Sequence, residues 1–144
     1  MFDFFNKKDK KKIDIDSSLS KITALLIHAA KIDENYTEIE KKIIIKALMD
    51  LNKLGLDKAN EILKEAEKKE EESNQIIEFT REIKKYPIEF RLKIIEIIWK
   101  IVYSDGASDN FESNLIRRIC GLLYVSDKEN GFVKEKIINQ LKNT

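Results

Sequence analysis

The sequence predicts an all-α protein with one domain, a bundle of about seven helices. The 144 residues include one proline and four glycines, too few for the many tight turns that a sheet of hairpins requires. Apolar residues recur at the three- and four-residue spacing of one helix face along most of the chain. The connections between these stretches are short, so we expect a basic, flexible tail over residues 1–16 and a single helical domain over residues 17–144.

The first two helices are separated by an acidic junction. The stretch SSLSKITALLIHAAKI begins with serines, which are common N-cap residues, and continues with an apolar stripe. Thr37 and Glu40 have the spacing of a capping box, so we expect the second helix to begin there. The apolar stripe of that helix consists of Ile39, Ile43, Ala47 and Leu51.

The remaining helices are delimited by caps and by one proline. Asp57 is expected to cap the third helix, and the fourth ends before Pro87. The fifth, IEFRLKIIEIIWKIVYSDG, is apolar on more than one side, which is typical of a helix at the centre of a bundle. Asp109 and Glu112 have the capping-box spacing at the start of the sixth helix, and Ser126 is expected to cap the seventh.

The chain contains an internal repeat. When the sequence is aligned with itself, LLIHAAKIDENYTEIEKKIIIKAL lies on IIWKIVYSDGASDNFESNLIRRIC. Each copy consists of a helix, an acidic junction and a second helix. We therefore expect two similar helical hairpins related by an approximate twofold axis, which pairs Asp33 with Asp105, Thr37 with Asp109, and Glu40 with Glu112.

Composition excludes several classes of protein. The 27 basic residues nearly cancel the 26 acidic ones, whereas a nucleic-acid-binding domain needs a net basic face. The single cysteine, Cys120, lies in the apolar stretch LIRRICGLL, so we expect an inert core thiol and a reducing, cytoplasmic location. No apolar run approaches the ~20 residues of a membrane span, and the N-terminus is too charged for a secretory signal.

The N-terminal stretch MFDFFNKKDKKK combines aromatic and basic side chains. Such a segment can rest on an anionic membrane surface, although a solvated tail is the favoured interpretation. The candidate membrane contacts are Phe2, Phe4, Phe5, Lys7, Lys8, Lys10, Lys11 and Lys12.

An enzyme is not expected. Nucleophilic catalysis needs a nucleophile, a base and an orienting group, and His28 is the only histidine. Its spacing from Leu25 indicates a partly buried packing residue. Trp99 and Tyr103 lie four residues apart, which favours a core stripe; on the surface they would be anchors for a protein partner.

The acidic junctions permit two interpretations. The favoured one is that their side chains cap backbone amides at helix starts. The alternative is an acidic patch that binds a divalent cation weakly, because the loops lack the glycine and the final glutamate of an EF-hand. Asp33 and Asp105 would be the core of this patch, and the complete candidate set is Asp33, Glu40, Asp105, Asp109 and Glu112.

Several motifs resemble the tellurite-resistance TerB family, in particular its small stand-alone bacterial members. The motifs are the D-x6-E pair from Asp33 to Glu40, the D-G-x5-E pair from Asp105 to Glu112, and the stretches LLIHAAKID, FTREIKK, RLKIIEIIWKIVYSDG and FESNLIRRICGLLYVSDK. The chain departs from the family pattern at Glu34, where a glycine is usual, and around Ser108–Asn110, where relatives tend to have a histidine.

The resemblance implies a seven-helix bundle with an acidic surface, linked to tellurite and metal-stress responses and to assembly with other proteins, often at the inner face of the membrane. We expect a monomer or weak dimer that acts as a non-catalytic interaction or metal-stress module and binds another protein. The alternative is a peripheral membrane adaptor or co-chaperone-like interaction domain recruited through the N-terminal segment.

Overall fold

A computed structural model of the chain describes residues 12–31, 36–73, 76–105 and 110–142, without the side chains of residues 12–17, 105 and 110–113. The described residues form seven α-helices and no strand, which confirms the predicted all-α fold. The 3-10 turn Tyr103–Asp105 follows the fifth helix. The helices are α1 (Lys12–Ala30), α2 (Glu38–Asn52), α3 (Leu56–Glu72), α4 (Ile76–Ile83), α5 (Ile88–Val102), α6 (Asn110–Leu122) and α7 (Asp127–Lys142).

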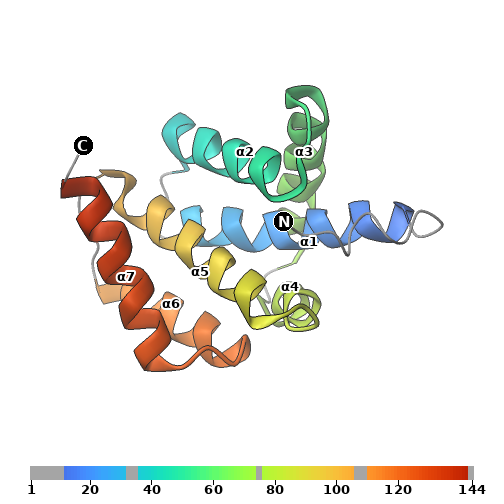
Figure 1. The fold of residues 1–144 in the computed structure, drawn as a ribbon. Coiled ribbons are helices and arrows are strands. Elements are labelled where there is room, and N and C mark those ends of the chain that lie inside the picture. Colours follow the sequence, from blue (N-terminus) through green and yellow to red (C-terminus); the bar gives the residue numbers. More distant parts are fainter. Residues whose placement is uncertain (1–11, 32–35, 74–75, 106–109, 143–144) are drawn as a thin grey trace.

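Helix α1 runs through the middle of the molecule (Figure 1). It packs against α2, α3, α4, α5 and α6. From Leu19 to Ala30 its side chains are almost all buried, because neighbours surround it on most sides. Helix α5 crosses α1 and is likewise mostly buried, as its wide apolar surface predicts.

The start of α1 differs from the prediction. The helix begins at Lys12, so residues 12–16 of the predicted tail are helical and the serines lie inside the helix. The hydroxyl groups of Ser18 and Ser20 donate hydrogen bonds of 2.6 Å to the carboxylates of Glu82 and Glu65. These serines therefore join α1 to α4 and α3 and do not cap α1.

Two predicted helix starts are confirmed. The backbone amide of Thr37 donates to Glu40 Oε1 at 2.7 Å, and the amide of Glu40 donates to Thr37 Oγ1 at 3.1 Å. The same reciprocal pair of bonds joins Ser126 and Glu129, at 3.0 and 3.1 Å. Each pair satisfies backbone donors that a helix start leaves without an intrahelical partner.

The predicted cap at Asp57 is wrong. Helix α3 begins at Leu56, and its N-cap is Gly55, which makes no side-chain capping bond. Asp57 lies inside the first turn instead, where the helix dipole favours a carboxylate. The other predicted cap, Asp109 with Glu112, falls outside the described residues or side chains.

The helix neighbours repeat between the two halves of the chain. Helix α1 packs on α2 and α3, just as α5 packs on α6 and α7. Helix α2 also packs on α3, as α6 packs on α7. Across the two halves, α1 packs on α6, as α5 packs on α2. The predicted repeat of two helices thus extends to three, and α4, the connection between the halves, has no counterpart among the described helices.

Candidate functional site

A groove of about 650 Å³ opens between α2 and α7, with α5 as its floor. Its lining combines apolar side chains with a few charged ones. Helix α2 contributes Ile39, Ile43, Lys46, Ala47, Asp50 and Leu51; α5 and the turn after it contribute Lys93, Glu96, Ile97, Lys100, Tyr103 and Ser104; α7 contributes Ile137, Gln140 and Leu141.

The α2 wall is the apolar stripe that the sequence predicts. Leu51 and Ala47 are buried at the base of the groove, while Ile39 is 60% exposed at its rim. The stripe spans three helical turns, about 18 Å from end to end. The capping box of Thr37 and Glu40 fixes where this wall begins.

The floor carries an ion cluster around one carboxylate. Glu96 lies 2.9 Å from Lys136 Nζ, 3.6 Å from Lys100 Nζ and 4.0 Å from Lys93 Nζ. Burial alone would raise the pKa of Glu96, but the hydrogen bond from Lys136 and the charges of the lysines hold it below its ordinary value. Glu96 is therefore ionised at neutral pH.

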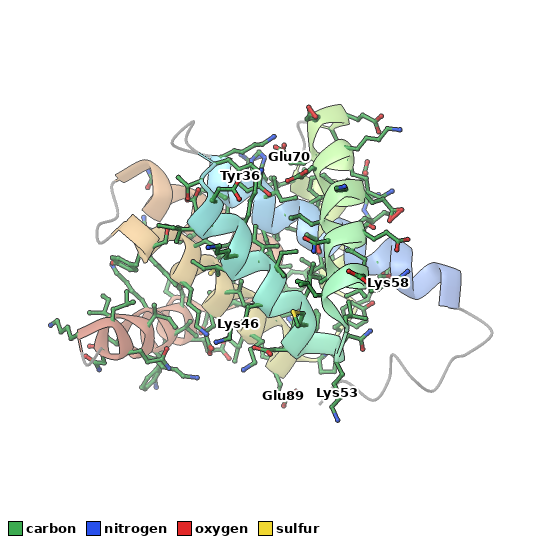
Figure 2. The ribbon with its side chains drawn as sticks, turned by 90° about the horizontal axis from the view of Figure 1, so that it is seen from above. Tyr36, Lys46, Lys53, Lys58, Glu70 and Glu89 are labelled. Atoms are coloured by element: carbon green, nitrogen blue, oxygen red, sulfur yellow. The ribbon has the colours of Figure 1, made fainter. Side chains whose placement is uncertain are left out.

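Positive charge exceeds negative charge at the groove. Among the described side chains, three lysines line it and a fourth pairs with Glu96 beside it, whereas Asp50 and Glu96 are the acidic lining residues. Figure 2 shows Lys46 on the side of α2 that faces α7. The remaining lysines of this group are Lys93, Lys100 and Lys136.

The two aromatic side chains for which a core stripe is predicted, with partner anchors as the alternative, differ in exposure. Trp99 is 2% exposed, and its ring nitrogen donates a hydrogen bond of 2.9 Å to Asn130 Oδ1, so it is a core residue and not an anchor. Tyr103 stacks on Trp99 with ring centroids 5.6 Å apart and is half-buried at the groove. Only Tyr103 is placed to contact a bound molecule.

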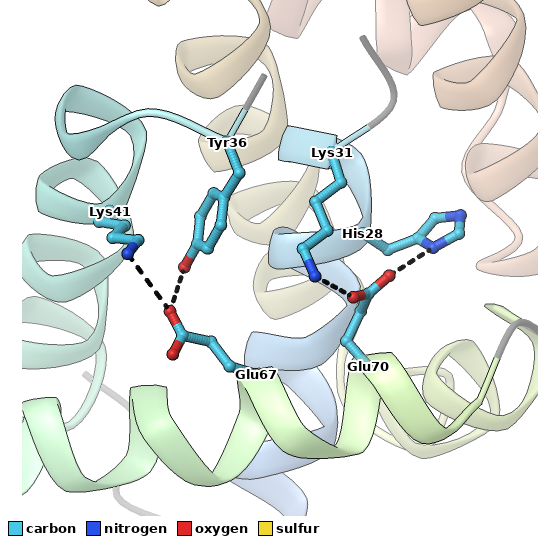
Figure 3. A network of polar contacts seen from close by, with 6 residues as sticks. All are labelled: His28, Lys31, Tyr36, Lys41, Glu67 and Glu70. Carbon is cyan, nitrogen blue, oxygen red and sulfur yellow. Dashed lines mark hydrogen bonds and ion pairs between the residues drawn. The ribbon is translucent and has the colours of Figure 1, made fainter. Parts of the chain in front are cut away.

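A second polar cluster joins α3 to the start of α2 and to the end of α1 (Figure 3). The Tyr36 hydroxyl donates to Glu67 at 2.9 Å, and Lys41 Nζ lies 4.0 Å from the same carboxylate. Burial, followed by this hydrogen bond to Glu67, raises the pKa of Tyr36, so the phenol stays a donor. The cluster anchors the beginning of the groove wall to α3.

The only histidine of the sequence, His28, belongs to the same cluster. Glu70 accepts from Lys31 Nζ at 2.8 Å and lies 3.3 Å from His28 Nδ1. His28 is partly buried, as predicted, and its neighbours are an ion pair without a nucleophile. The arrangement joins α1 to α3.

Cys120 is buried in α6, as predicted. Burial, with smaller contributions from the charges of Asp127 and Glu129, raises the pKa of its thiol to about 12. The thiol is therefore protonated and unreactive at neutral pH.

Most residues of the predicted cation site lie outside the described side chains. Glu40 takes part in the α2 capping box, but the side chains of Asp33, Asp105, Asp109 and Glu112 lie outside the description. Among the side chains that are described, no three of the metal-ligating types histidine, cysteine, aspartate and glutamate gather into a site.

The predicted membrane contacts of the N-terminus also lie outside the described part of the chain. Phe2, Phe4, Phe5, Lys7, Lys8, Lys10 and Lys11 precede it, and Lys12 begins α1 without a described side chain. Within the described ranges, no helix is both long enough and apolar enough to cross a membrane.

Comparison with known proteins gives one match. The family profile described as tellurite resistance protein TerB matches residues 19–134, which is most of the chain. No curated protein and no solved structure matches the sequence or the fold at a significant level.

Proposed function

We propose that this chain, which belongs to the TerB family, is a non-catalytic interaction domain that binds another protein in the groove between α2, α5 and α7. The observation that carries this proposal is the solvent exposure of apolar side chains along one groove. Ile39 and Leu141 are 60% and 45% exposed on opposite walls. Exposed apolar residues that rim a concave surface are typical of protein-binding sites.

The surroundings of the groove support binding without chemistry. In the described part of the chain its lining contains no cysteine and no histidine, and its Glu96 pairs with Lys93 and Lys100. Such charges orient a partner and speed its association. The apolar base supplies the area that excludes water.

A matched pair of variants tests this function. Ile39 and Leu56 each lie in the first turn of a helix, and they are 60% and 56% exposed, but only Ile39 lines the groove. Aspartate at either position is favourable for the helix dipole, so Ile39→Asp and Leu56→Asp should both fold normally. Equal thermal melting curves would verify this.

Affinity capture from the native cell with mass spectrometry is the measurement. We expect a partner that the parent and L56D retain and that I39D loses. Repeating the capture with a chelator tests the metal-stress association of the family. Identical captured proteins for the parent, I39D and L56D would contradict the proposal, because the groove would then contribute nothing to binding.

A further inference from the structure

We infer that the partner element is an amphipathic helix with acidic edges, which occupies the groove as α4 occupies the corresponding position on α1 and α6. This inference rests on the proposed function and names the partner chemistry of the same site. It draws on the repeat of the fold, on the composition of α4 and on the charge of the groove.

The repeat places the groove where a counterpart of α4 would lie. Helices α5 and α2, which form the floor and one wall, correspond to α1 and α6. Those two helices are the ones against which α4 packs. Helix α4 follows α3 in the chain, and the groove likewise adjoins the last turns of α7, the counterpart of α3.

Burial differs at one pair of corresponding positions. Leu115 of α6 is buried, whereas its counterpart Ile43 is only partly buried and lines the open groove. The next pair, Ile119 and Ala47, is buried on both helices. At the first position the face of α6 is thus covered, and the corresponding face of α2 is partly open.

Helix α4 shows what kind of element suits this position. It is eight residues long, and the side chains that it buries follow the spacing of one helix face. Its Glu82 accepts the hydrogen bond of Ser18 on α1, so a carboxylate flanks the apolar stripe. The buried residues are Ile76, Phe79, Thr80 and Ile83.

The charge of the groove favours acidic residues beside the apolar stripe of a bound helix. Among the described side chains, three lysines and two carboxylates line the groove, and Lys136 adds a further positive charge beside Glu96. Glutamate or aspartate beside the apolar stripe of a bound helix would face these lysines. A lysine-flanked helix would meet like charge.

The length of the groove sets the length of the helix. The α2 wall extends about 18 Å, which corresponds to about twelve residues in three turns. A small ligand at the apolar base would leave Ile39 and Leu141 in water, because both lie at the rim. A helix laid along the groove covers both, in the manner of other helix-in-groove complexes.

Fluorescence anisotropy with three synthetic peptides tests the inference. Each is about fourteen residues long, and the first two have one leucine stripe at helical spacing. In the first, glutamates flank the stripe; in the second, lysines replace the glutamates; in the third, the composition of the first is kept but the leucines are scrambled. We expect the first to bind at least about tenfold more tightly than the second, and the third not to bind.

Charge-reversed variants locate the binding. Lys46→Glu should weaken binding of the acidic peptide several-fold, whereas Lys64→Glu, an equal charge change on the exposed surface of α3, should leave it unchanged. I39D should abolish binding and L56D should not.

The remaining outcomes would overturn the inference. If the lysine-flanked peptide binds equally well or more tightly, the groove still binds a helix, but the inferred acidic flanks of the partner are wrong. If no peptide binds but I39D still loses its cellular partner, the proposed function stands, and the inference that the partner element is an amphipathic helix is wrong. Concentration-dependent dimerisation of the parent that I39D abolishes would assign the groove to a second copy of the chain.

Discussion

Helix α4 covers one face of α1 and of α6, whereas the corresponding face of α5 and of α2 borders a groove. Where α4 lies on α1 and α6, side chains such as Phe79 and Ile119 are completely buried. At the corresponding place on α5 and α2, which none of the described helices covers, lysines and the exposed Ile39 border the groove. A volume of about 650 Å³ is thus open where a counterpart of α4 would lie.

The covered face should be the one that stability depends on. Phe79→Ala removes a ring that is fully buried in α4 and leaves a cavity, so we expect a loss of about 3–5 kcal/mol in the free energy of unfolding. Urea denaturation measures it. The groove variant I39D should unfold within about 0.5 kcal/mol of the parent, since it changes an exposed side chain. A comparable loss in the free energy of unfolding for I39D would contradict the difference in burial between the two faces.

On the open face, the main electrostatic contribution should come from Glu96. Its folded-state pKa lies below the ordinary value, so its contribution is complete above the unfolded-state pKa and is lost as pH falls through the lower folded-state pKa. Glu96→Gln should cost about 1–2 kcal/mol at pH 7 and reduce the loss of stability between neutral and acidic pH. The measurement is urea unfolding at a series of pH values.

The control for this prediction is Glu61→Gln, which alters a carboxylate exposed on α3. It should keep the acid dependence of the parent. If E96Q and E61Q lose stability in parallel with the parent as pH falls, the lysine cluster does not stabilise the groove floor.

The start of the groove wall should be sensitive to its cap. Thr37→Ala leaves the amide of Glu40 without its hydroxyl acceptor and should cost about 1 kcal/mol. Thr37→Ser keeps the oxygen and should cost less. Thermal melting of both variants distinguishes a capping role from a loss of the threonine methyl group, because only the latter would make the two variants equal.

The smallest effect is expected at Cys120. Its raised thiol pKa and its burial should make it unreactive toward a thiol reagent at pH 8 in the folded protein, with rapid reaction in denaturant. Stoichiometric labelling within seconds under native conditions would mean that α6 opens readily and that its face is not stably covered.

Local features of the fold could be predicted from the sequence, because they depend on residues a few positions apart. The capping boxes at Thr37 and Ser126 and the stripe from Ile39 to Leu51 are of this kind. The spacing also predicts a cap at Asp57, but the N-cap of α3 is Gly55, two residues earlier.

Other features depend on distant partners and could not be predicted. Ser18 has the character of an N-cap, but its hydroxyl is taken by Glu82, which lies far along the chain. The spacing of Trp99 predicts a core residue, but its hydrogen bond to Asn130 of α7 depends on a distant partner. That the α2 stripe borders an open groove depends on where α5 and α7 lie, and no pattern within α2 carries this information.

Chemical-shift mapping by two-dimensional NMR tests most directly whether the groove accepts the missing helix. The isotope-labelled protein is titrated with the glutamate-flanked peptide, with the scrambled peptide as control. The account predicts shifts confined to α2, the second half of α5 and the last turns of α7, with α3 and α4 unchanged. Shifts centred on α3 or α4, or no shifts at concentrations where the peptide is helical, would contradict it.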